Sequence, residues 1–243
     1  MTDLAPTIVP AEATSKGLAS RIIGVLFSPR ATYADVAARP RWFGVLAFTC
    51  IILAVGYFWL LSTEVGKKAA LDQQTQIIES FGVKLNDQAL DRMEAGIERA
   101  RFTTPISQLI AIPLVTAIMA GILLGVFNAL LGGDARYKQV YAIVAHGTVI
   151  TALQTIFAIP LDYVRETLSS PTSLSVLTPF IDESSFLGRL FGMIDLFQVW
   201  GMLSLAIGLG VLYKRRTGPI ATSFFVIYFM IVAAIAAIRA GLS

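Results

Sequence analysis

Long apolar stretches alternate with short polar connections along most of this 243-residue chain. A helix needs about 20 apolar residues to cross a hydrocarbon core of about 30 Å, because it rises about 1.5 Å per residue. Each of these stretches is about long enough to do so, and a helix satisfies its own backbone hydrogen bonds inside lipid. We therefore expect transmembrane helices at 42–62, 104–131, 139–160, 188–213 and 218–238.

An apolar stripe at helical spacing also runs through the segment 15–27, with two basic residues lying off it. The stripe consists of Leu18, Ile22, Val25 and Leu26, and the basic residues are Lys16 and Arg21. This pattern predicts either a helix lying on the membrane surface or an ordinary helix packed under the bundle. Ser28 followed by Pro29 signals the start of a second short helix.

The connection 63–103 is too long for a structureless loop, and its apolar residues recur twice at helical spacing. We expect two helices separated at Gly82, with Asn86 as the N-cap of the second. The alternating charges of this connection indicate a solvated face rather than a metal site. The expected fold class is all-α: a polytopic membrane protein with a five-helix bundle and amphipathic flanking helices. It divides into an N-terminal segment 1–41 and a membrane domain 42–243.

Composition and charge support a membrane protein. Hydrophobic residues make up 56% of the chain and charged residues 14%, too little polar surface to cover a soluble globule of this size. The net charge of +3 does not indicate nucleic-acid binding, because the basic residues gather at the ends of the expected spans. The clusters on one side of the bundle are Arg39 with Arg41, Arg136 with Lys138, and Lys214 with Arg215 and Arg216.

The positive-inside rule places this side, and with it the N-terminus, in the cytoplasm. The C-terminus then lies outside a cytoplasmic (inner) membrane. The basic residues of the connection 63–103 leave the inverted orientation as an alternative.

Catalytic motifs are missing from the sequence. A single histidine and a single cysteine exclude His-rich or Cys-rich metal sites, and no glycine-rich phosphate loop, serine elbow or dinucleotide fingerprint occurs. We expect no enzyme activity, no cofactor and no metal. His146 in the third span and Asn128 in the second are candidates for a proton relay, but hydrogen bonding to a neighbouring helix is the favoured interpretation.

Small residues recur at four-residue intervals in the second span. They form a candidate packing ridge of Ala117, Gly121, Gly125 and Ala129. Such a ridge lets another helix backbone approach closely. The partner is either a helix of the same bundle, which we favour, or a helix of another molecule.

Three polar residues, Gln108, Gln154 and Asp195, lie at similar depth in the outer half of the bundle, counted along antiparallel spans, and Gln198 shares the helical face of Asp195. This candidate polar cluster consists of Asp195, Gln198, Gln154 and Gln108. A charged Asp195 buried alone in lipid would cost several kcal/mol, so it is expected to face the interior and bond to a partner or to be protonated. The cluster serves either a transport function or structural hydrogen bonding; alternatively, Asp195 reaches Arg189 or the outer interface.

Several segments resemble bacterial members of the Yip (Rab-interacting membrane protein, YIPF-like) family. They are "LFSPRATYADVAARPRW", "LGGDARYKQVYAIVAHG", "LDYVRETLSSPTSLSVL" and "FLGRLFGMIDLFQVW". The resemblance covers about residues 20–240 and implies a five-helix membrane domain with its termini on opposite sides. Eukaryotic members are implicated in vesicle trafficking. The chain lacks the Asp-Leu-Tyr-Gly-Pro motif of many of them, so no functional residue is transferred from that motif.

We therefore expect a non-enzymatic integral membrane scaffold or a membrane-organising, trafficking-like protein. Its expected partners are membrane lipids and other membrane proteins or copies of itself. The alternative is a small transporter, channel or lipid-moving protein that uses the polar cluster around Asp195. An intramembrane hydrolase is a third hypothesis, and it requires two reactive polar groups close together in a wet cavity.

Overall fold

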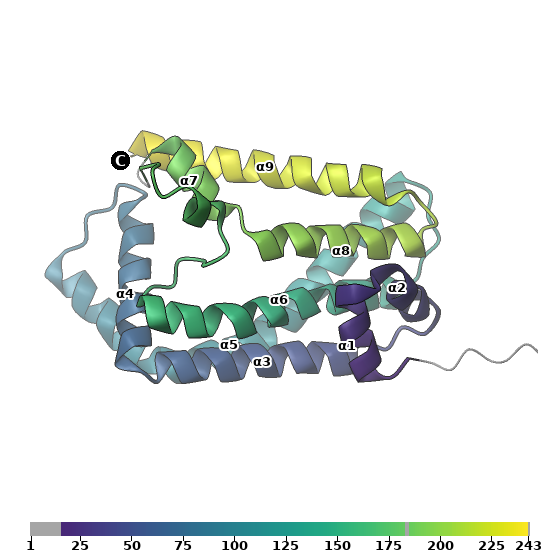
Figure 1. The fold of residues 1–243 in the computed structure, drawn as a ribbon, viewed down its shortest axis with the longest axis horizontal. Coiled ribbons are helices and arrows are strands. Elements are labelled where there is room, and N and C mark those ends of the chain that lie inside the picture. Colours follow the sequence, from purple (N-terminus) through teal and green to yellow (C-terminus); the bar gives the residue numbers. More distant parts are fainter. Residues whose placement is uncertain (1–15, 183–184, 243) are drawn as a thin grey trace, which may run out of the picture.

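Long helices lying side by side form the body of the protein (Figure 1). The computed structural model describes residues 16–182 and 185–242, so the first 15 residues of the expected N-terminal segment lie outside the described residues. Within the described ranges, four helices are long and apolar enough to cross a membrane: Phe43–Leu61, Asp87–Leu130, Tyr137–Arg165 and Thr217–Gly241. The architecture is that of an all-α polytopic membrane protein.

The helix that contains the second expected span begins well before it. After α3 (Phe43–Leu61) and α4 (Glu64–Glu79), α5 runs over Asp87–Leu124 and continues as the π-helix η1 (Gly125–Leu130). The Asn86 side chain accepts a hydrogen bond from the backbone N–H of Ala89 at 2.9 Å, as expected of its N-cap. Gly82 lies in the break between α4 and α5 with φ of 77°. The second expected outer helix and the second span are thus one helix of 44 residues, roughly 66 Å long.

The expected span 188–213 is not a single helix. It consists of α7 (Phe186–Met193) and α8 (Leu196–Leu212), separated by extended backbone at Ile194 and Asp195. This extended pair forms a short antiparallel bridge with the preceding loop, in which Leu174 N donates to Ile194 O at 2.9 Å and Leu196 N to Thr172 O at 3.1 Å. The helix breaks here because Asp195 starts a new helix as its N-cap. The hydropathy of the sequence does not show this break, because both α7 and α8 are apolar.

The two short N-terminal helices pack into the bundle. They are α1 (Leu18–Phe27) and α2 (Pro29–Ala38), and their residues Val25, Tyr33 and Val36 are fully buried in the main core. The interpretation of this segment as a helix lying on the membrane surface, which would leave Arg21 exposed, is wrong: Arg21 is only 2% exposed, and it pairs with Asp35 at 2.8 Å. The alternative interpretation, a helix packed under the bundle, describes α1.

The N-terminal half of α6 (Tyr137–Arg165) is the centre of the core. All residues from Val140 to His146 are buried, so neighbours surround this part of the helix on every side. Those neighbours are α1, α2, α3, α5 and α8. Tyr33 of α2 shares a buried hydrogen bond of 2.8 Å with Ser204 of α8, which joins the N-terminal helices to the bundle.

Connections sort to opposite ends of the molecule (Figure 1). The purple helices α1 and α2 lie at the same end as the turn before α6 and the turn between α8 and α9 (Thr217–Leu242). At the other end lie α4, α7 and the C-terminal end of α9. The basic clusters of the sequence therefore gather at the α1–α2 end.

The two glycines of the small-residue ridge do not pack against any other part of the chain that the structure describes. A Cβ atom built at Gly121 or at Gly125 would meet nothing within 4 Å, and Ala129 is exposed. Only Ala117, which is partly buried, contacts the core. The favoured expectation of a partner helix in the same bundle is wrong for the two glycines, because α5 turns this face outward. Contact with a helix of another molecule stays a prediction.

Candidate functional site: a polar cluster and pocket at the C-terminal end of α6

Asp195 is the centre of the polar cluster and is 6% exposed. As the N-cap of α8, its Oδ1 accepts hydrogen bonds from the backbone N–H groups of Phe197 at 2.7 Å and Gln198 at 3.2 Å. Its Oδ2 accepts from the hydroxyl of Thr172 at 2.6 Å and from the hydroxyl of Ser170. The carboxyl group thus caps the N-terminus of α8 and also holds the loop that follows α6.

Gln154 of α6 meets Asp195 as its depth in the third span predicts. Its Nε2 donates to Asp195 Oδ1 at 3.2 Å. The other two members of the predicted cluster are not partners of this carboxylate. The Gln198 side chain is exposed and only its backbone N–H takes part. Gln108 of α5 is half-buried and makes no hydrogen bond to Asp195, because α5 packs on α3 and α6 rather than on the start of α8.

The hydrogen bonds to Asp195 give it a structural role. Both carboxylate oxygens are engaged, by two backbone N–H groups, two hydroxyls and one amide. This arrangement ties α6, the loop after α6 and the start of α8 to a single side chain. Of the alternatives left open by the sequence, structural hydrogen bonding is the one that these contacts support.

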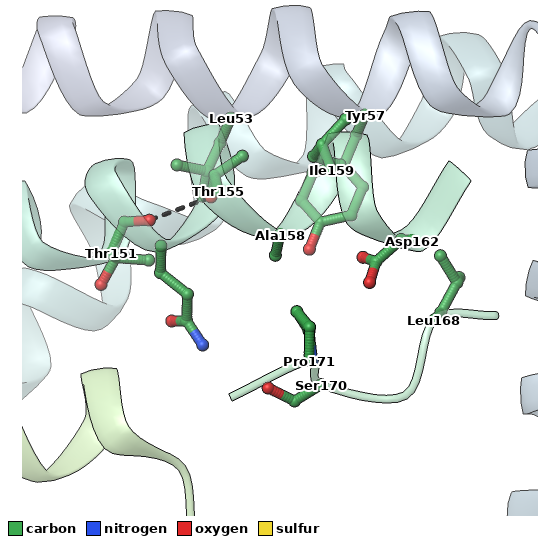
Figure 2. A pocket seen from close by; sticks show the side chains of 11 residues that line it. Leu53, Tyr57, Thr151, Thr155, Ala158, Ile159, Asp162, Leu168, Ser170 and Pro171 are labelled. Atoms are coloured by element: carbon green, nitrogen blue, oxygen red, sulfur yellow. Dashed lines mark hydrogen bonds between the residues drawn. The ribbon is translucent and has the colours of Figure 1, made fainter. Parts of the chain in front are cut away.

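A pocket of about 180 Å³ lies beside the cluster, between α3, α6 and the loop that follows α6 (Figure 2). Gln154 and Ser170 line it and also bind Asp195, so the cluster and the pocket share a wall. Gln73 of α4 donates to the carbonyl of Leu168 at 3.0 Å and so holds the loop in place. The remaining lining residues are Leu53, Tyr57, Thr151, Thr155, Ala158, Ile159, Asp162, Leu168 and Pro171.

Asp162 is the carboxylate of this pocket, and the sequence analysis did not single it out. Expecting the third span to end at residue 160 placed Asp162 outside the bundle, whereas α6 continues to Arg165. Asp162 is 8% exposed, and its buried Oδ1 has no hydrogen-bond partner among the residues that the structure describes. Figure 2 shows the Asp162 carboxyl and the Tyr57 side chain directed into the space beside Ser170.

Ser170 and Thr172 were also missed. Their signal is the run of small hydroxyl residues from Ser169 to Ser173 directly after the third span, a composition typical of side chains that hydrogen-bond locally. Nothing in the spacing of this run indicates that its partner lies more than 20 residues further along the chain.

The two polar residues proposed for a relay lie apart from this pocket. Asn128 donates to the carbonyl of Ala135 at 2.8 Å and accepts from the hydroxyl of Tyr213 at 2.9 Å, the hydrogen-bonding role that was favoured. His146 is fully buried, and its Nδ1 contacts the carbonyl of Ala142 in its own helix at 2.7 Å. Its Nε2 has no partner, so the expected bond from His146 to a neighbouring helix is not formed.

Comparison with known proteins adds evidence about the family of this chain, which the fold and the pocket do not identify by themselves. Searches of curated proteins and of solved structures found no match. The Yip1 domain, in contrast, matches residues 23–238, which include every buried residue of the main core cluster and the residues that line the pocket. The chain belongs to the Yip1 domain family.

Proposed function

We propose that this protein is a non-enzymatic membrane scaffold that brings together other membrane proteins or copies of itself. Membership of the Yip1 domain family supports a membrane-associated role of the general trafficking type. We further propose that it lies in an inner membrane, with the α1–α2 end in the cytoplasm, because the basic clusters gather at that end.

One observation carries the scaffold proposal: the interior around the N-terminal half of α6 is filled. The residues from Val140 to His146 are buried on all sides, and the neighbouring core positions are predominantly apolar. A path for ions or lipid headgroups needs a polar or open lining through the membrane. The polar pocket lies at the opposite, C-terminal end of α6. Because the interior around the N-terminal half of α6 is filled, we expect the function to depend on the outer surface of the protein.

The outward face of α5 is the surface that we propose for contact with another helix. Gly121 and Gly125 leave open space there, which allows close approach of a helix backbone. The test is crosslinking of the full chain in native membranes, followed by purification in mild detergent and mass spectrometry. Gly121→Leu is expected to lose specific crosslinked partners, whereas Val115→Leu, on another exposed face of the same helix, is expected to retain them. Equal crosslinking of both variants would count against this surface.

The alternative function is a small transporter, channel or lipid-moving protein, and the polar pocket next to Asp195 is the observation in its favour. Reconstitution separates the two proposals. The scaffold proposal expects vesicles containing the protein to pass ions and labelled lipid no faster than protein-free vesicles. Flux that requires the protein and disappears in a pocket variant would support the alternative instead.

A further inference from the structure

Asp162 is a buried carboxylate, and within residues 16–182 and 185–242 one of its two oxygens has no donor. Its residue is 8% exposed and its Oδ1 has neither solvent contact nor a hydrogen-bond partner. A buried polar group in this state costs free energy, and its presence calls for an explanation such as a ligand. Asp195, on the other side of the wall that Gln154 and Ser170 form, differs from Asp162 because both of its carboxylate oxygens accept hydrogen bonds.

The nearest basic residue along the chain does not supply the missing donor. Arg165 is exposed, and its guanidinium donates to the carbonyl of Ser169 at 3.1 Å and to the Ser169 hydroxyl at 3.5 Å. These bonds hold the guanidinium on the loop after α6. The Asp162 carboxyl is therefore left to face the pocket, as Figure 2 shows.

The other groups that line the pocket can also accept hydrogen bonds. They are the hydroxyls of Tyr57, Thr151, Thr155 and Ser170 and the amide of Gln154. With one carboxylate among several neutral acceptors, the pocket suits a singly charged donor. At about 180 Å³ it is smaller than the roughly 300–1,000 Å³ typical of pockets for drug-sized ligands, so a small polar group fits best.

We propose that this pocket binds a primary ammonium group, with Asp162 as its counter-ion. An ammonium group carries three N–H donors and one positive charge, which matches one carboxylate and nearby neutral acceptors. Calcium and magnesium prefer a shell of six or more oxygens that usually includes several carboxylates, and Asp162 is the only carboxylate among the described lining residues. A quaternary ammonium group favours several aromatic faces, and in the same described lining Tyr57 is the only aromatic residue.

The ammonium group can come from the headgroup of an aminophospholipid or from a soluble amine. The pocket lies near the end of a membrane-spanning helix and has apolar walls at Leu53, Ile159 and Leu168, a setting that both sources can reach. The proposal goes beyond the scaffold function and does not depend on it, because it concerns the inside of the bundle rather than the face of α5.

The test uses the purified full chain in a neutral detergent, with thermal stability as the readout. The probes are short-chain phosphatidylethanolamine, phosphatidylcholine with the same acyl chains, ethanolamine and sodium chloride. We expect phosphatidylethanolamine to raise the melting temperature of the wild type in a saturable way. The Asp162→Asn variant, which keeps the shape but removes the charge, is expected to weaken this binding by about tenfold or more. Glu166→Gln neutralises an exposed carboxylate four residues away and is expected to bind as the wild type does.

The probes also separate the sources of the amine. Stabilisation by phosphatidylethanolamine alone assigns a lipid headgroup, and stabilisation by ethanolamine as well assigns primary amines in general. The proposal is overturned if phosphatidylcholine or sodium stabilises the protein equally, if no amine has an effect, or if Asp162→Asn responds like the wild type. If Asp162→Asn does not fold, Tyr57→Phe takes its place, with several-fold weaker binding expected and an unchanged affinity overturning the proposal.

Discussion

The guanidinium of Arg21 in α1 and the carboxylate of Asp35 in α2 form an ion pair of 2.8 Å, with side-chain exposures of only 3% and 15%. The same guanidinium donates to the carbonyls of Arg41 at 3.3 Å and Arg39 at 3.1 Å, in the segment that leads into α3. One side chain thus fixes α1, α2 and the start of the first long helix relative to one another.

Removing this guanidinium is expected to destabilise the protein strongly. Arg21→Met keeps much of the side-chain length but leaves Asp35 and two carbonyls without their donor, at a cost of about 3 kcal/mol. Thermal unfolding in mild detergent measures the effect. Arg30→Met is the control, because Arg30 is exposed, and it should lie within about 0.5 kcal/mol of the wild type. Similar stabilities for the two variants would mean that α1 is not held by this pair.

Asp195→Ala is expected to lower the free energy of unfolding by about 2–4 kcal/mol, since it removes a helix cap and leaves buried donors unsatisfied. Asp195→Asn should cost less, because its remaining oxygen still caps α8. The exposed side chain of Gln198 provides the comparison, and Gln198→Ala should be nearly neutral. A neutral Asp195→Ala in the same unfolding assay would contradict the structural role of this carboxylate.

Two glycines should respond in opposite ways to an added side chain. In Gly208→Ala the new Cβ would lie 2.6 Å from Ile143 Cγ2 and 3.0 Å from the Tyr33 ring, and relieving this overlap is expected to cost about 1–3 kcal/mol. Gly121→Leu enters open space and should change the stability of the isolated protein by less than about 0.5 kcal/mol. Melting temperatures of the purified variants test both statements, and a marked loss in Gly121→Leu would show that this face is covered.

Cysteine labelling in intact cells tests the orientation. Gln74→Cys in α4 and Arg216→Cys before α9 are both exposed and lie toward opposite ends of the bundle, while the native Cys50 is buried. A membrane-impermeant maleimide is expected to label Gln74→Cys only. Labelling Arg216→Cys only would show the inverted bundle, and labelling both from outside would contradict opposite placement of the two sites.

The sequence predicted the helices better than it predicted their ends. Apolar length located α3, α6 and α9 to within a few residues, because a bilayer demands about 20 apolar residues per crossing. Apolar length did not show that the second outer helix, whose N-cap Asn86 was expected, continues into the second span as α5, since a helix can leave the membrane without a change in backbone geometry. Apolar length did not show the break before α8 either, since the residues on both sides of Ile194 and Asp195 are mostly apolar.

The residues of the candidate site were also predicted only in part from the sequence. Depth along antiparallel helices was enough to bring Gln154 to Asp195, because depth depends only on residue count and helical rise. Depth does not determine which face a side chain occupies, and so Gln108 was wrongly placed in the cluster. Gln198 was placed there by helical spacing from Asp195, which fails because Asp195 is the extended N-cap that precedes α8. Asp162 was missed because an error of a few residues in the end of α6 decides whether a carboxylate lies in the bundle or in the loop.

The hydrogen bond between Tyr33 and Ser204 has a consequence for biosynthesis. Its partners are separated by 171 residues, so the docking surface of α2 on α8 does not exist until most of the chain has left the ribosome. At roughly 5–20 residues per second this delay lasts roughly 10–30 s. During that time Tyr33 and Val36, which are fully buried in the finished protein, lack the α8 partner that completes their burial. The first helices to be synthesised are therefore among the last to reach their native packing.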